Sequence, residues 1–411
     1  MRYHGDKMAL IVQKYGGSSL ATIEKIKGVA EKVVADKRKG NRIVVVVSAM
    51  GKTTDNLINL ACQIMPFPPE KELDILLSTG EMVSVALLCM AIENCGEAAE
   101  GFPGYFAGIR TDSFHTKARI QMIEPGRILK ELEKESIIVI AGFQGLSPDS
   151  SITTLGRGGS DLTAIAIAAA VKADRCDIYT DVDGVFTTDP NIVQEARLIP
   201  EISYDEMLEM ASTGAKVMLS RAVEFAKRYN VPFSVKSTFG KGEGTMVKEL
   251  SLKEGADVSA VALDEKQAKM TIFRVPDRSG ISSNIFTALG KENINVDVIV
   301  QNVSKDNFAD ISFTVNTTEA AKTLKITEAI GKDLGAENVV CDRDIAKISI
   351  IGIGMMNHPG VAGRMFHALA NEGVNIEMIS TSEIKISCVI KKSDGQKALK
   401  AVHREFITNS Q

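Results

Sequence analysis

The sequence SGISSNIFTALGKENINVDVIVQN, residues 279–302, occurs a second time as PGVAGRMFHALANEGVNIEMISTS, residues 359–382. The two copies align without a gap, because Gly280, Phe286 and Asn295 each meet an identical residue at the same offset (360 − 280 = 80). Self-similarity at a fixed offset indicates that one supersecondary unit is used twice. The repeat therefore decides the fold of the carboxyl-terminal part of the chain.

The same predicted elements surround both copies, namely a strand before the repeat, an alternating strand after it and a closing helix. In chain order these elements occupy 269–275, 309–315 and 318–332 for the first copy, and 346–353, 384–390 and 394–406 for the second. This βαββαβ-like order predicts a ferredoxin-like fold for each copy. We expect the two units to pack side by side, with the strand at 258–263 completing the second.

Up to about residue 240 the chain alternates short β-rich runs with longer helical patterns. The strand candidates are largely apolar runs at 10–13, 42–47, 137–141, 176–180 and 232–236. Continuous apolar strands are typical of a mainly parallel sheet that helices cover on both faces. The predicted fold class is therefore an α/β sandwich followed by two ferredoxin-like units.

The domain bounds follow from these patterns. Residues 240–257 are rich in Gly, Lys and Glu and show no periodicity, which is typical of a linker. We expect four segments: 1–245 as the α/β domain, 246–264 as a linker and a strand contributed to the repeat region, and 265–340 and 341–411 as the two repeat units.

Composition excludes several classes of protein. A chain of 411 residues with a formal net charge of −4 and a pI near 5.9 has no basic footprint for nucleic acid or an anionic membrane. The longest uninterrupted apolar runs, such as 43–47 and 164–171, are shorter than a membrane span of roughly 20 residues. The amino terminus lacks the order of a signal peptide, so we expect a cytoplasmic protein that begins at Met1 or Met8.

Glycine-bearing loops follow several predicted strands, and ligands of open α/β sheets bind outside the carboxyl ends of the strands. KYGGSS (14–19) can present backbone N–H groups to an anion with Lys14 beside them, although a tight turn with a solvated lysine explains it equally well. TDVDGVFTTDP (180–190) lacks the later ligands of a calcium loop. It fits a turn at Asp183 with a nucleotide or Mg²⁺ contact better.

TTLGRGGSD (153–161) combines three glycines with one arginine just before a predicted helix. Arg157 offers a planar fork suited to a carboxylate or a phosphate. We expect Ser160 or Asp161 to be the N-cap of the helix, with the glycines aiming amides into the loop. Ordering three glycines costs conformational entropy, and an ordinary surface turn would not need them.

These motifs, in this order and spacing, resemble the aspartate kinase family, more narrowly its monofunctional bacterial class with tandem ACT domains. The motifs that carry the resemblance are KYGGSS, SAMG, AGFQG, LGRGGSD, YTDVDGVFTTDP, GAKVM, HPGVAGRMF and ISTSEIKIS. The resemblance implies an amino-acid-kinase fold that uses ATP with Mg²⁺ to phosphorylate the side-chain carboxylate of L-aspartate. That reaction is the first step toward lysine, threonine, methionine and diaminopimelate.

The resemblance also implies roles for individual residues. The catalytic set is Lys14, Arg157 and Asp161. The nucleotide set adds Tyr15, Gly16, Gly17, Ser18, Ser48, Ser160, Thr180, Asp181, Phe186, Thr187, Thr188, Asp189, Pro190, Asn191 and Lys216. The aspartate set is Thr54, Glu81, Arg157, Gly158, Gly159 and Ser160. It implies no dedicated protein metal site.

The repeat looks like a pair of ACT domains, which bind amino-acid effectors. The implied effector residues are Asp277, Asp297, Gln301, Asn302, Val361, Ala362, Asn375, Ile376, Ser382 and Glu383. Three positions depart from the family: Ser279 replaces Pro, Ala362 replaces Thr and Phe186 replaces Tyr. Lysine, threonine or both are the expected effectors.

Several alternatives stay open at this level. The chain is expected to form a dimer or tetramer through its ACT domains, and Met246 could start a separate regulatory subunit from the same gene. Another amino-acid kinase, acting on glutamate, acetylglutamate or UMP, would have a different substrate loop and usually no ACT pair. A non-enzymatic ACT amino-acid sensor would have lost Lys14, Glu81, Arg157 and Asp181, which are all present.

Overall fold

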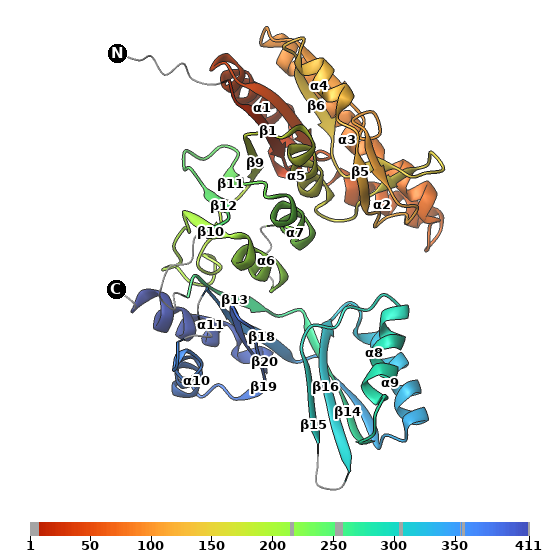
Figure 1. The fold of residues 1–411 in the computed structure, drawn as a ribbon, viewed down its shortest axis with the longest axis vertical. Helices are drawn as coiled ribbons and strands as arrows, with labels where there is room; N and C mark the ends of the chain where they lie inside the picture. The colour runs from red at the N-terminus through yellow and green to blue at the C-terminus, as the bar shows by residue number, and fades with distance from the viewer. Residues whose placement is uncertain are drawn as a thin grey trace. The chain divides into compact units, whose positions relative to one another are not determined.

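The chain forms two compact units in the computed structural model, which describes residues 8–213, 218–250, 258–303, 307–353, 355 and 358–409 (Figure 1). The amino-terminal unit comprises Met1–Val185, Leu198–Ala211 and Lys216–Ser251. The carboxyl-terminal unit comprises Leu252–Gln411 together with Phe186–Arg197 and Ser212–Ala215. One short segment from the middle of the chain, Phe186–Arg197, thus belongs to the later unit.

The amino-terminal unit is built on an eight-stranded sheet with the order β10-β12-β11-β9-β1-β2-β6-β3. Its central neighbours β9, β1, β2 and β6 are parallel, which confirms the predicted mainly parallel sheet. The strands are β1 (Leu10–Tyr15), β2 (Arg42–Val47), β3 (Ala99–Phe102), β6 (Ile137–Ala141), β9 (Arg175–Thr180), β10 (Glu201–Ser203), β11 (Phe233–Ser237) and β12 (Thr245–Lys248).

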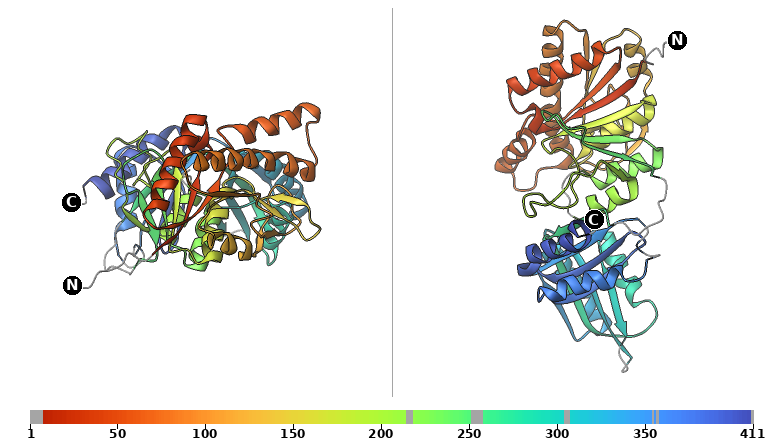
Figure 2. Two further views of the ribbon diagram at one scale, coloured as in Figure 1. Left: turned by 90° about the horizontal axis from the view of Figure 1, so that it is seen from above. Right: turned by 90° about the vertical axis from the view of Figure 1, so that its left-hand side faces the viewer.

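Helices cover both faces of this sheet (Figures 1 and 2). On one face, α1 and α3 pack in a core with alternate residues of the central strands, such as Ile11, Val45 and Val139. On the other face α5 lies against β1, β2 and β9 and packs on α7. The helices of the unit are α1 (Ile23–Arg38), α2 (Thr53–Ile64), α3 (Glu70–Asn94), α4 (Gly126–Leu132), α5 (Gly159–Val171), α6 (Tyr204–Ser212) and α7 (Ser220–Tyr229).

Helix α3 is long and apolar enough to cross a membrane by length and composition alone. The uninterrupted apolar runs of the sequence did not reveal it, because polar residues punctuate this helix. Of its most apolar window, 44% is buried inside the fold. The buried residues of α3 include Asp74, Ser78, Glu81 and Ser84, which fits a core helix that presents polar groups to a site.

A second sheet of the amino-terminal unit, with the order β5-β4-β7-β8, stands beside the main one. It matters for the site because its last strand leads directly into Arg157. Its strands are β4 (Ile109–Thr111), β5 (Ile120–Ile123), β7 (Gln144–Leu146) and β8 (Ile152–Thr154).

The carboxyl-terminal unit contains two antiparallel four-stranded sheets, one for each copy of the repeat. The first has the order β15-β16-β14-β17 and the second β13-β18-β20-β19, so that β13 pairs with β18 in the sheet of the second copy (Figure 1). The strands are β13 (Ala260–Asp264), β14 (Gln267–Pro276), β15 (Ile299–Val303), β16 (Phe308–Asn316), β17 (Asn338–Asp342), β18 (Ile345–Ile351), β19 (Ile376–Thr381) and β20 (Lys385–Lys391).

Two helices pack against each of these sheets, as the ferredoxin-like pattern requires. They are α8 (Ile281–Lys291) and α9 (Ala320–Leu334) in the first copy, and α10 (Val361–Asn371) and α11 (Gly395–His403) in the second. The predicted pair of ferredoxin-like units is therefore confirmed.

Charge pairs join the two copies within the carboxyl-terminal unit. Lys347 pairs with Asp297, and Lys269 pairs with Glu377. Asp297 and Glu377 occupy equivalent positions of the repeat (377 − 297 = 80). Each copy thus contributes one lysine and one carboxylate, so the two ion pairs are reciprocal. A small apolar cluster also joins the copies, formed by Val298, Ile345, Met378 and Val389.

Thr187 anchors the segment Phe186–Arg197 in the carboxyl-terminal unit. Its carbonyl accepts from the amide of Val261 on β13 at 2.8 Å. Its hydroxyl Oγ1 lies 2.9 Å from Nε2 of His403 on α11 and accepts from the amide of Arg197 at 3.0 Å. His403 is buried, which lowers its pKa. Val193 completes the attachment by packing in the core of the second copy.

Candidate active site and effector pocket

Four loops meet at the carboxyl edge of the main sheet, because backbone hydrogen bonds link them where the strands end. Gly16 donates to the carbonyl of Tyr179 at 3.2 Å, and Ser48 donates to the carbonyl of Tyr15 at 3.1 Å. Gly142 donates to the carbonyl of Val47 at 2.9 Å. The predicted phosphate loop KYGGSS therefore lies beside SAMG, AGFQG and the end of β9.

At two of these positions a neighbouring part of the chain comes so close to the backbone that only glycine fits. A Cβ on Gly17 would lie 2.7 Å from the carbonyl oxygen of Ala49. A Cβ on Gly142 would lie 2.8 Å from Cβ of Ser160. Distances this short exclude any side chain, so both glycines hold neighbouring loops together at the sheet edge.

Lys14 and Asp161 form an ion pair at the centre of this edge. Nζ of Lys14, near the end of β1, lies 2.6 Å from Oδ1 of Asp161, in the first turn of α5. The two side chains are 10% and 11% exposed. A carboxylate in the first turn also interacts favourably with the positive end of the helix dipole. The ion pair therefore holds the ammonium group of Lys14 in place where the loops converge.

The expected N-cap of α5 was wrong. The helix begins at Gly159 after Gly158, which has φ of 69°, and no side chain caps it. Asp161 pairs with Lys14 instead, and the buried Ser160 packs against Gly142. The first-turn amides are thus not occupied by a capping side chain.

Glu81 is a buried carboxyl group with one oxygen unused. Its Oε1 accepts from the amide of Ala49 at 3.1 Å, while Oε2 is buried without a hydrogen-bond partner among the described residues. Burial raises the pKa of Glu81 to about 7. Buried polar atoms are usually satisfied, so Oε2 indicates a place for a donor from a ligand.

Arg157 lies in the loop between β8 and α5 and is exposed. The loop is shaped by its glycines: Gly158 adopts a left-handed conformation, and a Cβ on Gly159 would lie 2.9 Å from Cβ of Leu155. Phe143 of AGFQG, itself at φ of 71°, packs against the same glycine. The glycines therefore fix the backbone of the loop, while the exposed side chain of Arg157 can reach a ligand.

The other predicted residues of the amino-terminal unit lie around this edge. Thr180 donates from Oγ1 to Oδ1 of the exposed Asp181 at 3.1 Å. Thr54, in the first turn of α2, and Ser48 are half-buried. Ser18 is also half-buried, and its carbonyl accepts from Nζ of Lys25 at 2.8 Å. The predicted Lys216 falls outside the described residues.

The predicted nucleotide residues from Phe186 to Asn191 belong to the carboxyl-terminal unit. Thr187 is held by Val261, Arg197 and His403 as described above. Asp189 accepts from both the backbone and side-chain nitrogens of Asn191 at 2.9 Å. The structure therefore divides the predicted nucleotide set between two compact units. A continuous motif in the sequence gave no sign of this division.

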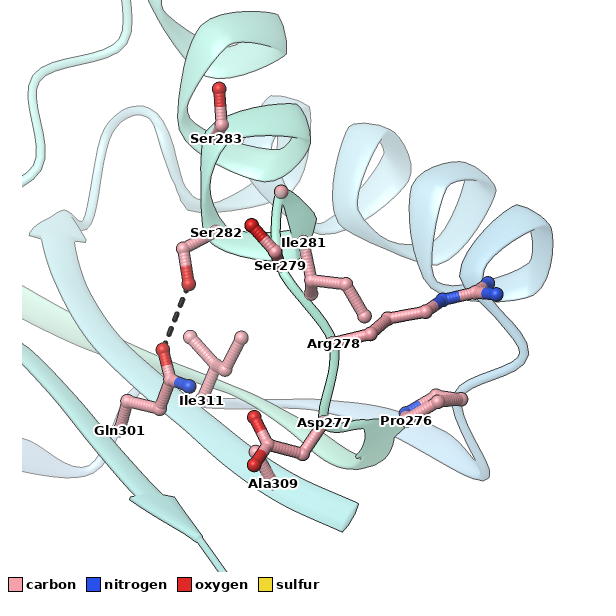
Figure 3. A pocket seen from close by; sticks show the side chains of 11 residues that line it. Pro276, Asp277, Arg278, Ser279, Ile281, Ser282, Ser283, Gln301, Ala309 and Ile311 are labelled. Atoms are coloured by element: carbon pink, nitrogen blue, oxygen red, sulfur yellow. Dashed lines mark hydrogen bonds between the residues drawn. The ribbon is translucent and has the colours of Figure 1, made fainter. Parts of the chain in front are cut away.

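A pocket of about 280 Å³ lies in the first copy of the repeat, where β14 runs into α8 (Figure 3). Ser282 donates from Oγ to Oε1 of Gln301 at 2.8 Å across it. Asp277 points toward the same space, whereas Arg278 extends away from it (Figure 3). The pocket thus brings together two predicted effector residues, Asp277 and Gln301, although Asn302 does not line it.

The remaining predicted effector residues lie elsewhere in the carboxyl-terminal unit. Asp297 is engaged by Lys347. The buried Val361 begins α10, and Ala362 follows it. The others lie at or near β19 in the second copy: Asn375, Ile376, Ser382 and Glu383.

Sequence reasoning missed a buried network centred on Asp74 of α3. The fully buried carboxylate accepts from Oγ1 of Thr154 at 2.5 Å and from the amide of Thr116 at 3.0 Å. Nδ1 of His115 lies 2.7 Å from Oδ2. A periodic pattern could not reveal it, but an acidic residue on the inward face of an apolar helix was a signal, because such residues are rarely buried without partners.

The described residues contain no group of three or more His, Cys, Asp or Glu side chains placed to hold a metal ion. Of the carboxyl groups in the predicted site, Asp161 is paired with Lys14, and Asp181 is exposed near the sheet edge. A metal that arrives with a nucleotide needs one or two carboxylates besides its phosphate and water ligands.

Fold and site define an amino acid kinase with two appended ACT domains. Residues 9–237 match the amino acid kinase family, and residues 269–335 and 348–406 each match an ACT domain. The chain is 48% identical over 405 residues to the aspartokinase of Mycolicibacterium smegmatis, an alignment that covers 97% of this chain and 96% of the relative. The chain belongs to the aspartokinase family, so its activity is that of an aspartate kinase.

Solved structures agree over the whole length. E. coli aspartokinase III in complex with aspartate and ADP (R-state) is 26% identical, with a TM-score of 0.82 and coverage of 96% of this chain and 99% of that chain. The same protein in complex with lysine and aspartate (T-state) is also 26% identical, with a TM-score of 0.76 and coverage of 97% and 99%. Family membership sets aside the other kinases and the non-enzymatic sensor.

Proposed function

We propose that the loops at the edge of the main sheet form the active site, with Lys14 facing the transferring phosphoryl group. The observation that carries this proposal is the nearly buried Lys14–Asp161 ion pair among four glycine-bearing loops. Of the three residues assigned to phosphate, Gly16 already donates its amide to Tyr179 and shapes the loop. The amides of Gly17 and Ser18 are the proposed donors to phosphate, and Asp161 keeps the lysine in place. A preorganised cation at the developing charge is the main requirement of phosphoryl transfer.

The reaction needs no general base. The side-chain carboxylate of aspartate has a pKa of about 3.9 and is ionised at neutral pH. It attacks the γ-phosphorus of ATP, a new O–P bond forms, and ADP leaves with the electrons of the broken bond. The catalytic residues therefore serve positioning and charge neutralisation.

Aspartate is held between Glu81 and Arg157. Oε2 of Glu81 is a buried acceptor without a protein donor among the described residues, which suits the substrate ammonium. The exposed guanidinium of Arg157 offers two parallel donors to a carboxylate. Thr54 and the Gly158–Ser160 loop complete this set.

ATP binds with Mg²⁺, and the E. coli relative was crystallised with ADP. Ser48, Ser160, Thr180 and Asp181 are the proposed nucleotide residues of the amino-terminal unit. The side chain of Tyr15 is fully buried and its hydroxyl donates to Oε1 of Gln13, so only its backbone is available to a nucleotide. The family resemblance also assigns Phe186–Asn191 and Lys216 to the nucleotide. Asp181 would hold the ion through water ligands, since it is exposed at the sheet edge. When bound, the ion neutralises charge on the phosphates.

Feedback by lysine, threonine or both acts through the ACT pair, for which the lysine complex of the E. coli relative is the supporting comparison. The pocket beside Ser282 and Gln301 is of a size to take one amino acid, and Asp277 supplies an acceptor for an ammonium group. Asp297, Asn302 and the second-copy residues are the further effector positions.

The assembly and location are part of the same proposal. The enzyme forms a homo-oligomer through its ACT domains in the cytoplasm, and a separate regulatory subunit can start at Met246. The exposed hydrophobic side chains on β15 and β19, Ile299 and Ile379, support an interface there.

One experiment tests the function and its regulation together. Aspartyl phosphate is trapped as its hydroxamate with ATP and Mg²⁺ present, while lysine and threonine are added singly and jointly. We expect hydroxamate to form with aspartate and at most a trace with glutamate. Activity that is indifferent to both effectors would overturn the proposed feedback, and an absence of hydroxamate would overturn the active site.

A further inference from the structure

Asp74 connects the two elements that hold aspartate in the proposed function. Helix α3 carries both Asp74 and Glu81, which are seven residues apart (81 − 74 = 7) and therefore lie on the same face of the helix. The hydroxyl of Thr154 donates to Asp74 at the last residue of β8. Arg157 follows only three residues later (157 − 154 = 3).

A second connection runs through the loop that contains His115 and Thr116. Asp74 accepts from the amide of Thr116 at 3.0 Å, and Nδ1 of His115 lies 2.7 Å away from it. The carbonyl oxygen of Thr116 in turn lies 3.2 Å from where a Cβ on Gly156 would stand. Gly156 directly precedes Arg157, so this loop packs against the backbone next to the arginine.

The carboxyl group of Asp74 is fully buried and contacts three polar groups from two other chain segments: the amide of Thr116 and the hydroxyl of Thr154, which donate to it, and Nδ1 of His115. A buried carboxylate is costly unless it is hydrogen-bonded, and the bonds that satisfy it also fix their donors in place. The donors here belong to the support of the Arg157 loop rather than to the core of the main sheet.

We propose that Asp74 is a positioning residue for aspartate: it sets the separation between Glu81, which accepts the substrate ammonium, and Arg157, which grips a carboxylate. The inference rests on the proposed roles of Glu81 and Arg157. Aspartate and glutamate differ by one methylene, and a site discriminates such a difference by roughly 10–200-fold when its groups are held rigidly. Loosening the Thr154–Asp74 bond should therefore weaken aspartate binding and relax the discrimination against glutamate.

The adjacent threonines of β8 provide a matched pair. Thr154 bonds Asp74, whereas Thr153 is equally buried and its hydroxyl lies 2.6 Å from Oγ1 of Thr111 on β4. Both Thr154→Val and Thr153→Val remove one buried hydroxyl without changing the size of the side chain. Only the first removes a hydrogen bond to a carboxylate, which is the stronger kind.

The experiment measures KM and kcat for aspartate, glutamate and ATP on the full chain, with thermal unfolding to verify that each variant is folded. Thr154→Val should raise KM for aspartate about 10-fold while KM for ATP changes less than about twofold, since one charge-assisted bond is lost. Thr154→Ser should restore the wild-type KM, and Thr153→Val should leave it unchanged. Asp74→Asn should give a larger increase in the same direction.

Equal increases in KM for aspartate and ATP would overturn the inference, as would the same increase from Thr153→Val or a failure of Thr154→Ser to restore binding. Arg157→Ala separates this inference from the function on which it rests. If Arg157→Ala leaves KM for aspartate unchanged, the proposed substrate site itself is wrong. If Arg157→Ala raises KM and Thr154→Val does not, only the role of Asp74 is wrong.

Discussion

The candidate active site and the effector pocket are built in opposite ways. At the sheet edge the central charge pair, Lys14 and Asp161, is nearly buried and already engaged at 2.6 Å. In the first ACT copy the polar groups, such as Asp277 and Gln301, are exposed around an open pocket. Chemistry needs charges fixed before the substrate arrives, whereas an effector must enter and leave at ordinary concentrations. Substitutions should therefore separate turnover from regulation.

The largest effect is expected from Lys14→Ala. Loss of the cation should lower kcat about 10³-fold, since it removes a preorganised charge and leaves the carboxylate of Asp161 unpaired. Effector affinity, measured by direct binding, should stay the same. Lys52→Ala, which removes an exposed lysine from the neighbouring loop, is the control for net charge. A Lys14 variant with near-normal turnover contradicts the assignment.

Arg157→Ala should raise KM for aspartate about 10²-fold and KM for ATP less than about twofold, because a bidentate charge-assisted contact is lost from one substrate only. Arg157→Lys should fall between, since lysine keeps the charge without the planar fork. Initial rates over a grid of both substrates give the two constants. Parallel increases in both would place the arginine outside the aspartate site.

Glu81 should make aspartate binding depend on pH. Its raised pKa of about 7 means that the group is protonated at lower pH and cannot accept an ammonium ion as a carboxylate. KM for aspartate should therefore rise about tenfold for each pH unit below 7, while KM for ATP stays flat. In Glu81→Gln, KM should be high at every pH. If KM of the wild-type enzyme for aspartate stays constant between about pH 5 and pH 8, this role of Glu81 is contradicted.

Glu81 should also make the free energy of unfolding depend on pH. Its pKa is raised from 4.5 in the unfolded chain to about 7 in the folded one, so the folded state binds the proton more tightly. The free energy of unfolding should fall as pH rises from 4.5 to about 7, by about 3 kcal/mol, and level off above. Denaturant titrations of wild type and Glu81→Gln at several pH values isolate this contribution, because the variant lacks it.

In the effector pocket, Gln301→Ala should raise the effector concentration for half-inhibition about fivefold, the equivalent of one hydrogen bond. KM and kcat without effector should be unchanged, in contrast to all the active-site variants. Thr381 occupies the equivalent position in the second copy (301 + 80 = 381), so Thr381→Ala is the matched control. An unaltered inhibition curve for Gln301→Ala would remove this pocket from the effector site.

The smallest effect is expected from Ser282→Ala. It removes the donor to Gln301 and makes the first copy resemble the second, where Ala362 stands at the same place (282 + 80 = 362). Half-inhibition should shift about twofold, since the amide of Gln301 remains available. The reverse change, Ala362→Ser, should have no effect on inhibition. If it strengthens inhibition instead, the second copy holds the dominant effector site.

The sequence was most informative where structure repeats locally. The gapless repeat predicted both ACT units, and the apolar runs predicted the central strands, because burial on both faces leaves a direct pattern in the residues. The predicted N-cap of α5, Ser160 or Asp161, was wrong. Asp161 pairs with Lys14, which is distant in the sequence, instead of capping the helix. The Asp74–Thr154 bond spans 80 residues and leaves no local pattern at all.

The segment Phe186–Arg197 limits how this gene can be divided. A regulatory chain translated from Met246 would lack Thr187, so the amide of Val261 and the imidazole of His403 would lose the partner they have in the full chain. Val193 would also be missing from the core of the second ACT copy. We therefore expect such a fragment to have a lower free energy of unfolding than the same residues within the full chain, because a buried part of its core is missing.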